Sequence, residues 1–202
     1  ETLSILEDLY LPFRPKRRTR ATVAREKGLE PLARKIFEQS EMDVQSEAAL
    51  YLSQENGVLS IEEALAGARD IIAEWINEDP QARHCMRELF WSRGMIHSRV
   101  LPDKIQEGMK YQDYYDWREP VAHAPSHRVL AMRRGEREEV LSLSIFPPED
   151  EALQMLRDMF VKGEGEAQIQ VARAVVDGYK RLLSLSLETE TRLAAKKKAD
   201  AT

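Results

Sequence analysis

The chain of 202 residues contains almost no cysteine, since Cys85 is the only one. A lone cysteine excludes an internal disulfide and is typical of a reducing compartment, so we expect a cytoplasmic protein. No uninterrupted apolar stretch approaches the roughly 20 residues that a membrane-spanning helix needs. Only 9 glycines and 9 prolines are present. This composition leaves room for long helices and favours a mainly α fold.

The sequence also lacks the residue patterns of common catalytic and metal sites. His123 and His127 are the only histidines four residues apart, and Pro125 between them disfavours a shared helical face. No zinc-ligand spacing, glycine-rich phosphate loop or nucleophile elbow is present. Asp113 and Asp116 could face the same way on a helix, but a solvated or capping role is favoured over a catalytic pair. We therefore expect no enzymatic activity, no cofactor and no metal site.

Positive charge is concentrated near the start of the chain. Between residues 14 and 35 there are nine lysines and arginines against two glutamates, a net charge of +7 in a chain whose total is -5. The remainder therefore carries -12. A contact with nucleic acid should be confined to the basic region and should weaken steeply with salt.

Five cations lie in residues 14–20, which we call the basic segment. Pro12 and Pro15 fix their own φ angles and disfavour helix in the residues before them, so this region should be a stiff, extended connector. The predicted nucleic-acid-binding residues are its cations: Arg14, Lys16, Arg17, Arg18 and Arg20.

Two interpretations of the basic segment stay open. An ordered connector loses less entropy when its charges engage phosphates, which favours a preorganised RNA or single-strand contact. Alternatively, the arginines pair with nearby acids such as Asp8 or Glu26 and have a structural role. Physical reasoning from the sequence weighs the two about equally.

The first half of the chain reads as a series of helices. Thr19 can cap a helix over 20–27 that ends at Gly28, and Pro31 suits the first turn of a helix over about 30–39. These two short helices resemble a helix-turn-helix, a pattern that more often serves packing than DNA recognition. A further helix is predicted over 46–55.

A helical bundle is expected over residues 46–94. Ser60 and Glu63 form a capping box for a helix that extends to about Glu78, and Asp79-Pro80 begins the next helix, which ends at Gly94. We expect four or more antiparallel helices over residues 45–94. Their core should contain Leu65, Ile72, Trp75, Met86 and Phe90.

The second half is less regular. Residues 95–102 should be extended or irregular, 110–117 helical, and a short helix should begin at Ser126. Residues 140–145 alternate leucine or isoleucine with serine and form the one convincing strand, whose partner is left open. A hairpin arm over 128–134 is the alternative. Helices are predicted over 149–160, 167–183 and from Ser186 onwards.

Two clusters invite a functional interpretation but favour a structural one. Tyr111, Tyr114, Tyr115 and Trp117 could stack on bases. Their neighbourhood is acidic, however, so we favour packing in a core or between domains by about four to one. Arg128, next to His127, is interpreted as one partner of a structural ion pair.

Several stretches together resemble the Tex family of bacterial transcription accessory proteins. The first runs over residues 7–22 (EDLYLPFRPKRRTRAT) and continues as AREKGLEPLA over 24–33. Later matches occur in the same order: ALAGARDI at 64–71, YYDWREP at 114–120, PSHRVLA at 125–131 and LETE at 187–190. One departure is Leu185, where the family usually has proline, and it puts the position of a helix break in doubt.

The resemblance implies a place within a longer protein. It suggests a helical and helix-turn-helix-like part that precedes a ribonuclease-H-like YqgF domain, with helix-hairpin-helix elements and an OB-type RNA-binding barrel beyond it. We interpret the chain as a fragment, because it begins with Glu1 and stops within a polar, helix-favouring stretch. Four ranges are predicted: 1–45 (helix, basic segment and helix-turn-helix-like segment), 46–94 (bundle), 95–165 (mixed helix and loop with a short strand) and 166–202 (C-terminal helices leading to a missing domain).

The sequence thus predicts a mainly α, multi-helix fold with at most one or two short strands. The predicted function is a non-enzymatic scaffold that adds a weak RNA contact through the basic segment. The alternative is a protein-interaction scaffold that contacts the transcription machinery and makes no direct contact with nucleic acid. Other domains of the same full-length protein are further expected partners.

Overall fold

The computed structural model describes residues 2–13 and 17–202. These residues form two compact units, each assembled from two separate stretches. Unit 1 combines the chain up to residue 84 with residues 153–183, and unit 2 combines residues 85–152 with 184–202. The four ranges predicted from the sequence each cover one continuous stretch of the chain, and that division stays a prediction. The mainly α class is confirmed.

Unit 1 is helical in the part of the chain that the structure describes. Its elements are α1 (Thr2–Tyr10), a 3-10 turn (Leu11–Phe13), α2 (Arg20–Glu26), α3 (Glu30–Glu38), α4 (Val44–Ala49), α5 (Ile61–Glu78) and α9 (Glu166–Gly178). Two further helices, α6 (Pro80–Arg93) and α8 (Glu149–Phe160), each contribute residues to both units.

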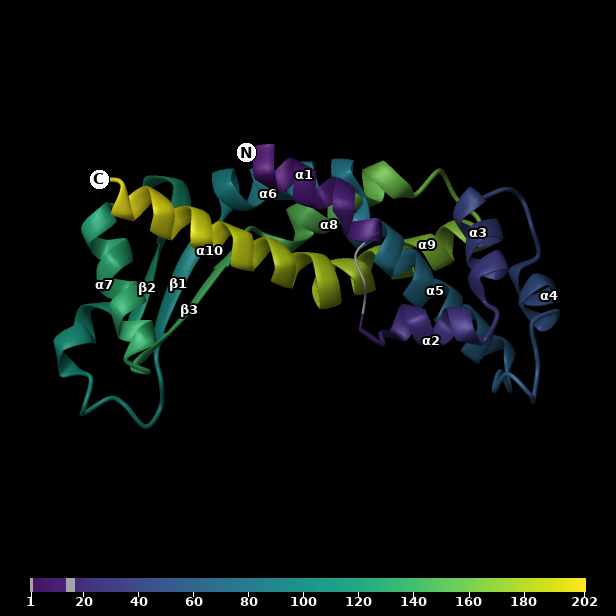
Figure 1. The fold of residues 1–202 in the computed structure, drawn as a ribbon, viewed down its shortest axis with the longest axis horizontal. Coiled ribbons are helices and arrows are strands. Elements are labelled where there is room, and N and C mark those ends of the chain that lie inside the picture. Colours follow the sequence, from purple (N-terminus) through teal and green to yellow (C-terminus); the bar gives the residue numbers. More distant parts are fainter. Residues whose placement is uncertain (1, 14–16) are drawn as a thin grey trace. The chain divides into compact units, whose positions relative to one another are not determined.

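Helix α5 is the centre of unit 1. Nine of its 18 residues are buried, and it packs against α2, α3, α4 and α9 (Figure 1). The predicted capping box starts it: Ser60 Oγ accepts from the Glu63 N–H at 3.1 Å, and the Glu63 carboxylate accepts from the Leu59 N–H at 2.8 Å. Local capping therefore places the helix, and burial of its apolar face holds it there.

The prediction of four or more helices over residues 45–94 is wrong. The structure describes this range in full, and it contains only α4, α5 and α6. Helix α4 ends at Ala49, and Ser53 pairs with Val58 through backbone hydrogen bonds across the Asn56-Gly57 turn. Because residues 53–58 form this turn, α4 does not extend to residue 55 as predicted. The predicted core residues Leu65, Ile72, Met86 and Phe90 are buried, whereas Trp75 is only half-buried.

Unit 2 contains a three-stranded antiparallel sheet, which exceeds the expected one or two strands. Its strands are β1 (Met95–Val100), β2 (Asp116–Pro120) and β3 (Leu141–Phe146), in the order β2-β1-β3. Ile96 lies opposite Glu119 on one side and Ile145 on the other. The partner of the predicted strand is therefore β1 of the same chain.

Two predictions for this region are wrong. Residues 110–117 are not one helix, because a 3-10 segment (Met109–Tyr114) leads into β2. Residues 128–134 are not a hairpin arm, because they lie in α7 (Ser126–Arg137), which agrees with the predicted helix beginning at Ser126. Pairing with β1 determines β2, and its sequence carries no apolar alternation that signals a strand.

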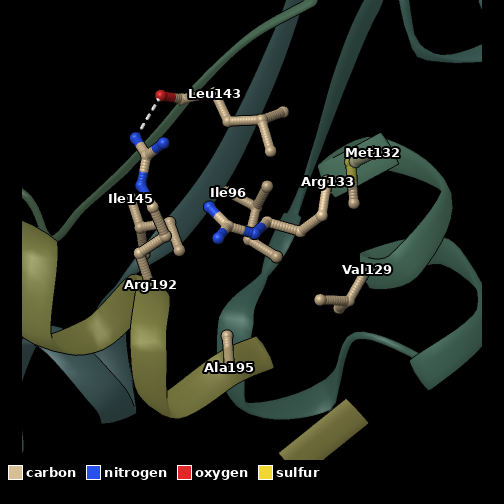
Figure 2. Close-up of a pocket in the computed structure, with 8 residues that line it drawn as sticks. All are labelled: Ile96, Val129, Met132, Arg133, Leu143, Ile145, Arg192 and Ala195. Atoms are coloured by element: carbon tan, nitrogen blue, oxygen red, sulfur yellow. Dashed lines mark hydrogen bonds between the residues drawn. The ribbon is translucent and has the colours of Figure 1, made fainter. Parts of the chain in front are cut away.

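Helices α7 and α10 (Ser184–Asp200) pack against the sheet through its apolar face. Val129, Met132 and Ala195 meet Ile96, Leu143 and Ile145 in one buried cluster. Figure 2 shows the small cavity left between these side chains, which the arms of Arg133 and Arg192 also line. Its volume is about 10 Å³, which is at most the space of one water molecule.

A π-helical turn (Tyr179–Leu183) separates α9 from α10. Helix α10 begins at Ser184, and Leu185 lies in its first turn. Leucine keeps the backbone N–H that proline lacks, so a helix can run through this position. The break that the family's proline suggests is therefore replaced here by a π turn a few residues earlier.

Gly94 lies where α6 turns into β1, and we predict that Gly94→Ala destabilises the protein. A Cβ atom at this position would lie 2.0 Å from the Phe90 carbonyl oxygen and 3.3 Å from Ile145 Cγ2. The backbone would have to shift, with an expected loss of about 1–3 kcal/mol in the free energy of unfolding. Urea unfolding measures this loss. The exposed Ser92→Ala is the control, and equal midpoints for the two variants would contradict the prediction.

Candidate nucleic-acid interface

The basic segment is described in its second half. Arg14 and Lys16 lie outside the described residues. Arg17, Arg18 and Arg20 are all exposed. Thr19 between them caps α2, since its hydroxyl oxygen accepts from the Thr22 N–H at 3.1 Å. The predicted cap is confirmed, and it fixes the backbone from which the neighbouring arginines extend.

Arg18 fits the structural interpretation. Its guanidinium pairs with both carboxylate oxygens of Glu26, at 3.0 and 3.1 Å. Both side chains remain more than half exposed. An ion pair this exposed contributes little to stability, because water screens it. Arg18 is therefore engaged with Glu26 but open to solvent.

Arg17 and Arg20 are different, because neither forms a hydrogen bond or ion pair within residues 2–13 and 17–202. Their positive charges face water and are available to an anion. The two interpretations of the basic segment thus apply to different residues: Arg18 forms an ion pair with a carboxylate, whereas Arg17 and Arg20 form none within the described residues.

Glu74 of α5 contacts the cap residue of α2 and one of its arginines. Its side chain is buried, and one oxygen accepts from Arg25 Nη1 at 2.8 Å while the other lies 3.4 Å from the Thr19 hydroxyl. A buried carboxylate needs such partners to offset its lost hydration. Glu74 therefore holds α2 on α5, and with α2 it holds the end of the basic segment.

The helix-turn-helix-like pair consists of α2 and α3, joined through Gly28 at φ 78°. Two cations of α3 lie beside acids: Arg34 lies 3.4 Å from Glu30, and Lys35 lies 3.0 Å from Glu47. The hydrogen bond that Lys35 Nζ donates to the Glu47 carboxylate raises the pKa of Lys35. These pairings reduce the charge that α3 presents, and recognition of DNA by this pair stays a hypothesis.

Asp70, within the ALAGARDI motif, lies beside Arg181, and the charge of Arg20 also acts on its carboxylate. Its nearest oxygen is 3.9 Å from Arg181 Nη2, whereas Asp177 binds the same guanidinium at 2.9 Å. Burial raises the pKa of Asp70, although Arg181 opposes the shift. Ionised Asp70 is therefore held in the folded chain at a cost.

We predict that the stability of the Asp70→Asn variant, relative to that of the native chain, increases as the pH rises. A carboxyl with a raised folded-state pKa binds its proton more tightly when folded, so its ionisation lowers the free energy of unfolding. This loss begins near the ordinary aspartate pKa of about 3.9 and is complete above the folded-state pKa. Asparagine cannot ionise, so the variant should gain on the native chain in melting temperature between pH 3.5 and pH 7.

Asp43→Asn provides the opposite control. Asp43 caps α4, and its hydrogen bonds with Ser46 lower the pKa of its carboxyl. Its ionised form stabilises the folded chain above the unfolded pKa, so this variant should lose ground as the pH rises over the same interval. The same pH trend for both variants would show that the Asp70 explanation is wrong.

The aromatic cluster of unit 2 packs inside that unit, as the sequence favoured. Tyr111 is buried, and Tyr114 and Trp117 are partly buried against the unit's apolar clusters. Arg128 pairs with the buried carboxylate of Glu119 at 3.0 Å and lies over the Trp117 ring. The structural interpretation of Arg128 is confirmed.

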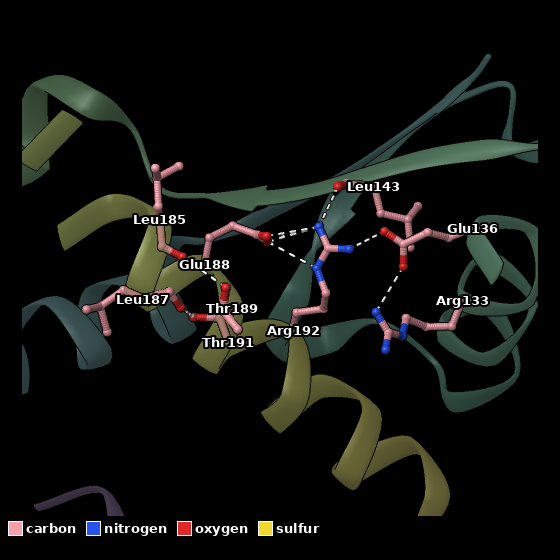
Figure 3. Close-up of polar contacts among 9 residues, drawn as sticks. All are labelled: Arg133, Glu136, Leu143, Leu185, Leu187, Glu188, Thr189, Thr191 and Arg192. Atoms are coloured by element: carbon pink, nitrogen blue, oxygen red, sulfur yellow. Dashed lines mark hydrogen bonds and ion pairs between the residues drawn. The ribbon is translucent and has the colours of Figure 1, made fainter. Parts of the chain in front are cut away.

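The LETE motif at 187–190 supplies carboxylates to two arginines of unit 2. Figure 3 shows the Arg192 guanidinium between Glu188 of its own helix, Glu136 of α7 and the Leu143 carbonyl oxygen of β3. Glu136 also accepts from Arg133 at 2.9 Å. Glu190 binds Arg87 at 2.8 Å. Arg192 thus joins α10, α7 and the sheet, a role the sequence motif did not reveal.

We predict that Arg192→Met destabilises the protein by about 1–3 kcal/mol, because Glu188 and the Leu143 carbonyl lose their charged donor. The urea midpoint measures the effect. Lys196→Met, an exposed change one turn later in α10, is the matched control and should leave the midpoint nearly unchanged. Equal midpoints for the two variants would rule out this role of Arg192.

Among residues 2–13 and 17–202, no three side chains of histidine, cysteine, aspartate or glutamate gather as a metal-binding group. No helix in those residues combines the length and apolar character needed to cross a bilayer.

Comparison with known proteins gives the family. The fold and its exposed arginines define a mainly α-helical region with a small basic surface, and residues 39–202 match the family described as Tex central region-like. The chain therefore belongs to the Tex family of transcription accessory proteins.

Individual relatives agree. Transcriptional accessory protein Tex of Neisseria gonorrhoeae is 37% identical over 97% of this chain and 27% of its own length. Protein tex of Bordetella pertussis is 44% identical over 72% of this chain and 18% of its own. The uncharacterized protein YdcI of Bacillus subtilis is 39% identical over 98% of this chain and 28% of its own. The chain thus spans about a quarter or less of the length of these curated relatives.

Proposed function

We propose that this chain is a non-enzymatic scaffold of a Tex-like, cytoplasmic transcription accessory protein and makes a weak contact with RNA through its basic segment. The observation that carries the proposal is the exposure of Arg17 and Arg20, neither of which forms a hydrogen bond or an ion pair in the described chain. Arg20 follows Thr19 directly and Arg17 lies two residues before it, and the cap and the Glu74 contact of Thr19 hold the backbone at residue 19 in place. Preordered cations lose less entropy when they bind phosphates.

The contact is expected to be weak and independent of sequence. Arginines that extend from an exposed turn reach phosphates without entering a groove, so they position a strand and do not read its bases. The chain as a whole is acidic, with a net charge of -5. Repulsion from the rest of the surface confines the RNA contact to this region.

A specific observation favours a second candidate, a protein-interaction scaffold. Helix α1 leaves Leu3, Leu6 and Leu9 more than half exposed. Exposed apolar side chains on one helix are common at protein interaction sites. The transcription machinery or other domains of the full-length protein would be the partner of α1, and this role needs no nucleic acid.

The predicted effect of Arg17→Ala/Arg20→Ala is weaker binding of the 202-residue chain to a labelled single-stranded RNA, with a shallower salt dependence. Each phosphate contact contributes about 0.7 to the slope of log affinity against log salt for single strands, so the double variant should lose about 1.4. Fluorescence anisotropy over a salt series measures both quantities.

Arg173→Ala is the matched control, because Arg173 is an exposed cation of α9 and its removal changes net charge without touching the basic segment. It should leave the slope unchanged. Thermal melting confirms that every variant is folded. If the double variant binds RNA with native affinity and slope, the RNA proposal fails and the protein-interaction candidate gains.

A further inference from the structure

A groove in unit 1 has no assigned role. It lies where α3, α5 and α8 come together, and its volume is about 630 Å³. Sites for small organic groups typically fall between about 300 and 1,000 Å³. Six residues define its character: Arg34, Phe37, Gln39, Trp75, Phe160 and Lys162.

Aromatic rings form the apolar part of the groove. The ring centroids of Phe37 and Trp75 are 5.7 Å apart, and those of Phe37 and Phe160 are 6.3 Å apart. Trp75 is half-buried, so part of its indole faces the opening. The exposed part of such an aromatic ring offers a flat surface on which another ring can stack.

Gln39 fixes the wall beside these rings. Its backbone adopts φ 58°, and its buried side chain donates to the Phe160 carbonyl and accepts from the Lys162 N–H, both at 2.7 Å. Gln168 donates to the Gln39 carbonyl at 2.9 Å. Because both ends of the Gln39 amide are engaged, the backbone of residues 160–162 on this wall of the groove is fixed by hydrogen bonds.

Cations stand at the rim. The Arg34 guanidinium lies 5.9 Å from the centre of the Trp75 ring, yet the side chain is 68% exposed and holds Glu30 only at 3.4 Å. Lys162 is exposed on the other wall. Arginine is suited to stack on a base and to bind phosphate at the same time. The rim can therefore hold the backbone of a strand whose base enters the groove.

The groove also contains two acids, and they do not prevent this use. The Asp79 carboxylate already accepts from the Ala82 N–H at 2.8 Å, where it caps α6. Glu38 is exposed beside the aromatic floor. A carboxylate accepts hydrogen bonds from the exocyclic amino groups of bases. Base recognition and phosphate contact would thus use different parts of the groove.

Hydrogen bonds and ion pairs within unit 1 link the end of the basic segment to the groove. Thr19 and Arg25 both reach Glu74, the residue before Trp75. Arg25 and Arg34 both reach Glu30, and Arg34 covers Trp75. Ion pairs through Glu30 therefore link Arg25 of α2, the helix that follows the basic segment, to Arg34 at the edge of the groove. Cations beside partly exposed aromatic rings are typical of proteins that bind single strands.

We propose that this groove binds a nucleobase of single-stranded RNA, which stacks on Trp75 while Arg34 and Lys162 hold the adjoining phosphates. The proposal rests on the RNA contact proposed for the basic segment and extends it, because the groove adds a contact that requires a base. Trp75 is the stacking residue, and Phe37 and Phe160 support its orientation.

Trp75 itself reports on the proposal. The chain has three tryptophans, so the variant Trp91→Phe/Trp117→Phe keeps Trp75 as the sole indole. The probes are an oligo(A) RNA of ten nucleotides and an abasic strand of the same length. Oligo(A) should quench the Trp75 emission, whereas the abasic strand should bind through its phosphates and leave the emission unchanged.

Affinity provides a second readout in the native tryptophan background. Trp75→Leu should weaken binding of labelled oligo(A) by roughly 5- to 100-fold, the range for loss of one stacked base, and leave binding of the abasic strand unchanged. Trp75→Phe keeps an aromatic ring and should retain most of the affinity. Thermal melting of each variant separates loss of binding from loss of fold.

The outcomes distinguish this proposal from the one it rests on. Arg17→Ala/Arg20→Ala should weaken binding of both probes, because it removes phosphate contacts. Native affinity of Trp75→Leu for oligo(A), or unchanged Trp75 emission on oligo(A) binding, overturns the groove proposal and leaves the basic segment's RNA contact standing. A groove that holds a protein segment instead of a base would give this second result.

Discussion

Burial of α5 is the constraint on which unit 1 depends. Four helices pack around it, and the carboxylate of Glu74 is enclosed with them. Because a buried charge is costly without partners, Arg25 and the cap residue Thr19 must lie beside it. The position of α2 thus follows from the electrostatic needs of one side chain of α5, and Trp75 is presented to solvent one residue further along the same helix.

The same constraint separates structural from available arginines. Arg25, Arg83 and Arg192 are drawn into partly or fully buried pairs with Glu74, Asp8 and Glu188. Cations that lie beyond the reach of such acids stay in water. A protein with more acids than bases can therefore still present free positive charge locally, because ion pairing is decided by distance and burial and not by net charge.

Local signals predicted most helices well, since Thr19, Ser60 and Asp79 act on backbone groups only a few residues away. Strand β2 and the early end of α4 were missed, because pairing with β1 and the Ser53–Val58 contact determine them. For the candidate site, the sequence identified the cations and one partner, Glu26, which pairs with Arg18, but not the contacts between residues far apart in the chain. Arg25 meets Glu74 and Gln39 meets Phe160 across long separations in the chain, and no short pattern encodes such meetings.

The interleaving of the two units has a consequence for synthesis on the ribosome. Helix α9 covers α5, yet residues 85–152 must be translated before α9 emerges. At about 5–20 residues per second this interval lasts roughly 3–14 s, during which the side of α5 that packs against α9 has no cover. A nascent chain in this interval is a natural client for a chaperone, and slow codons within residues 85–152 would prolong its exposure.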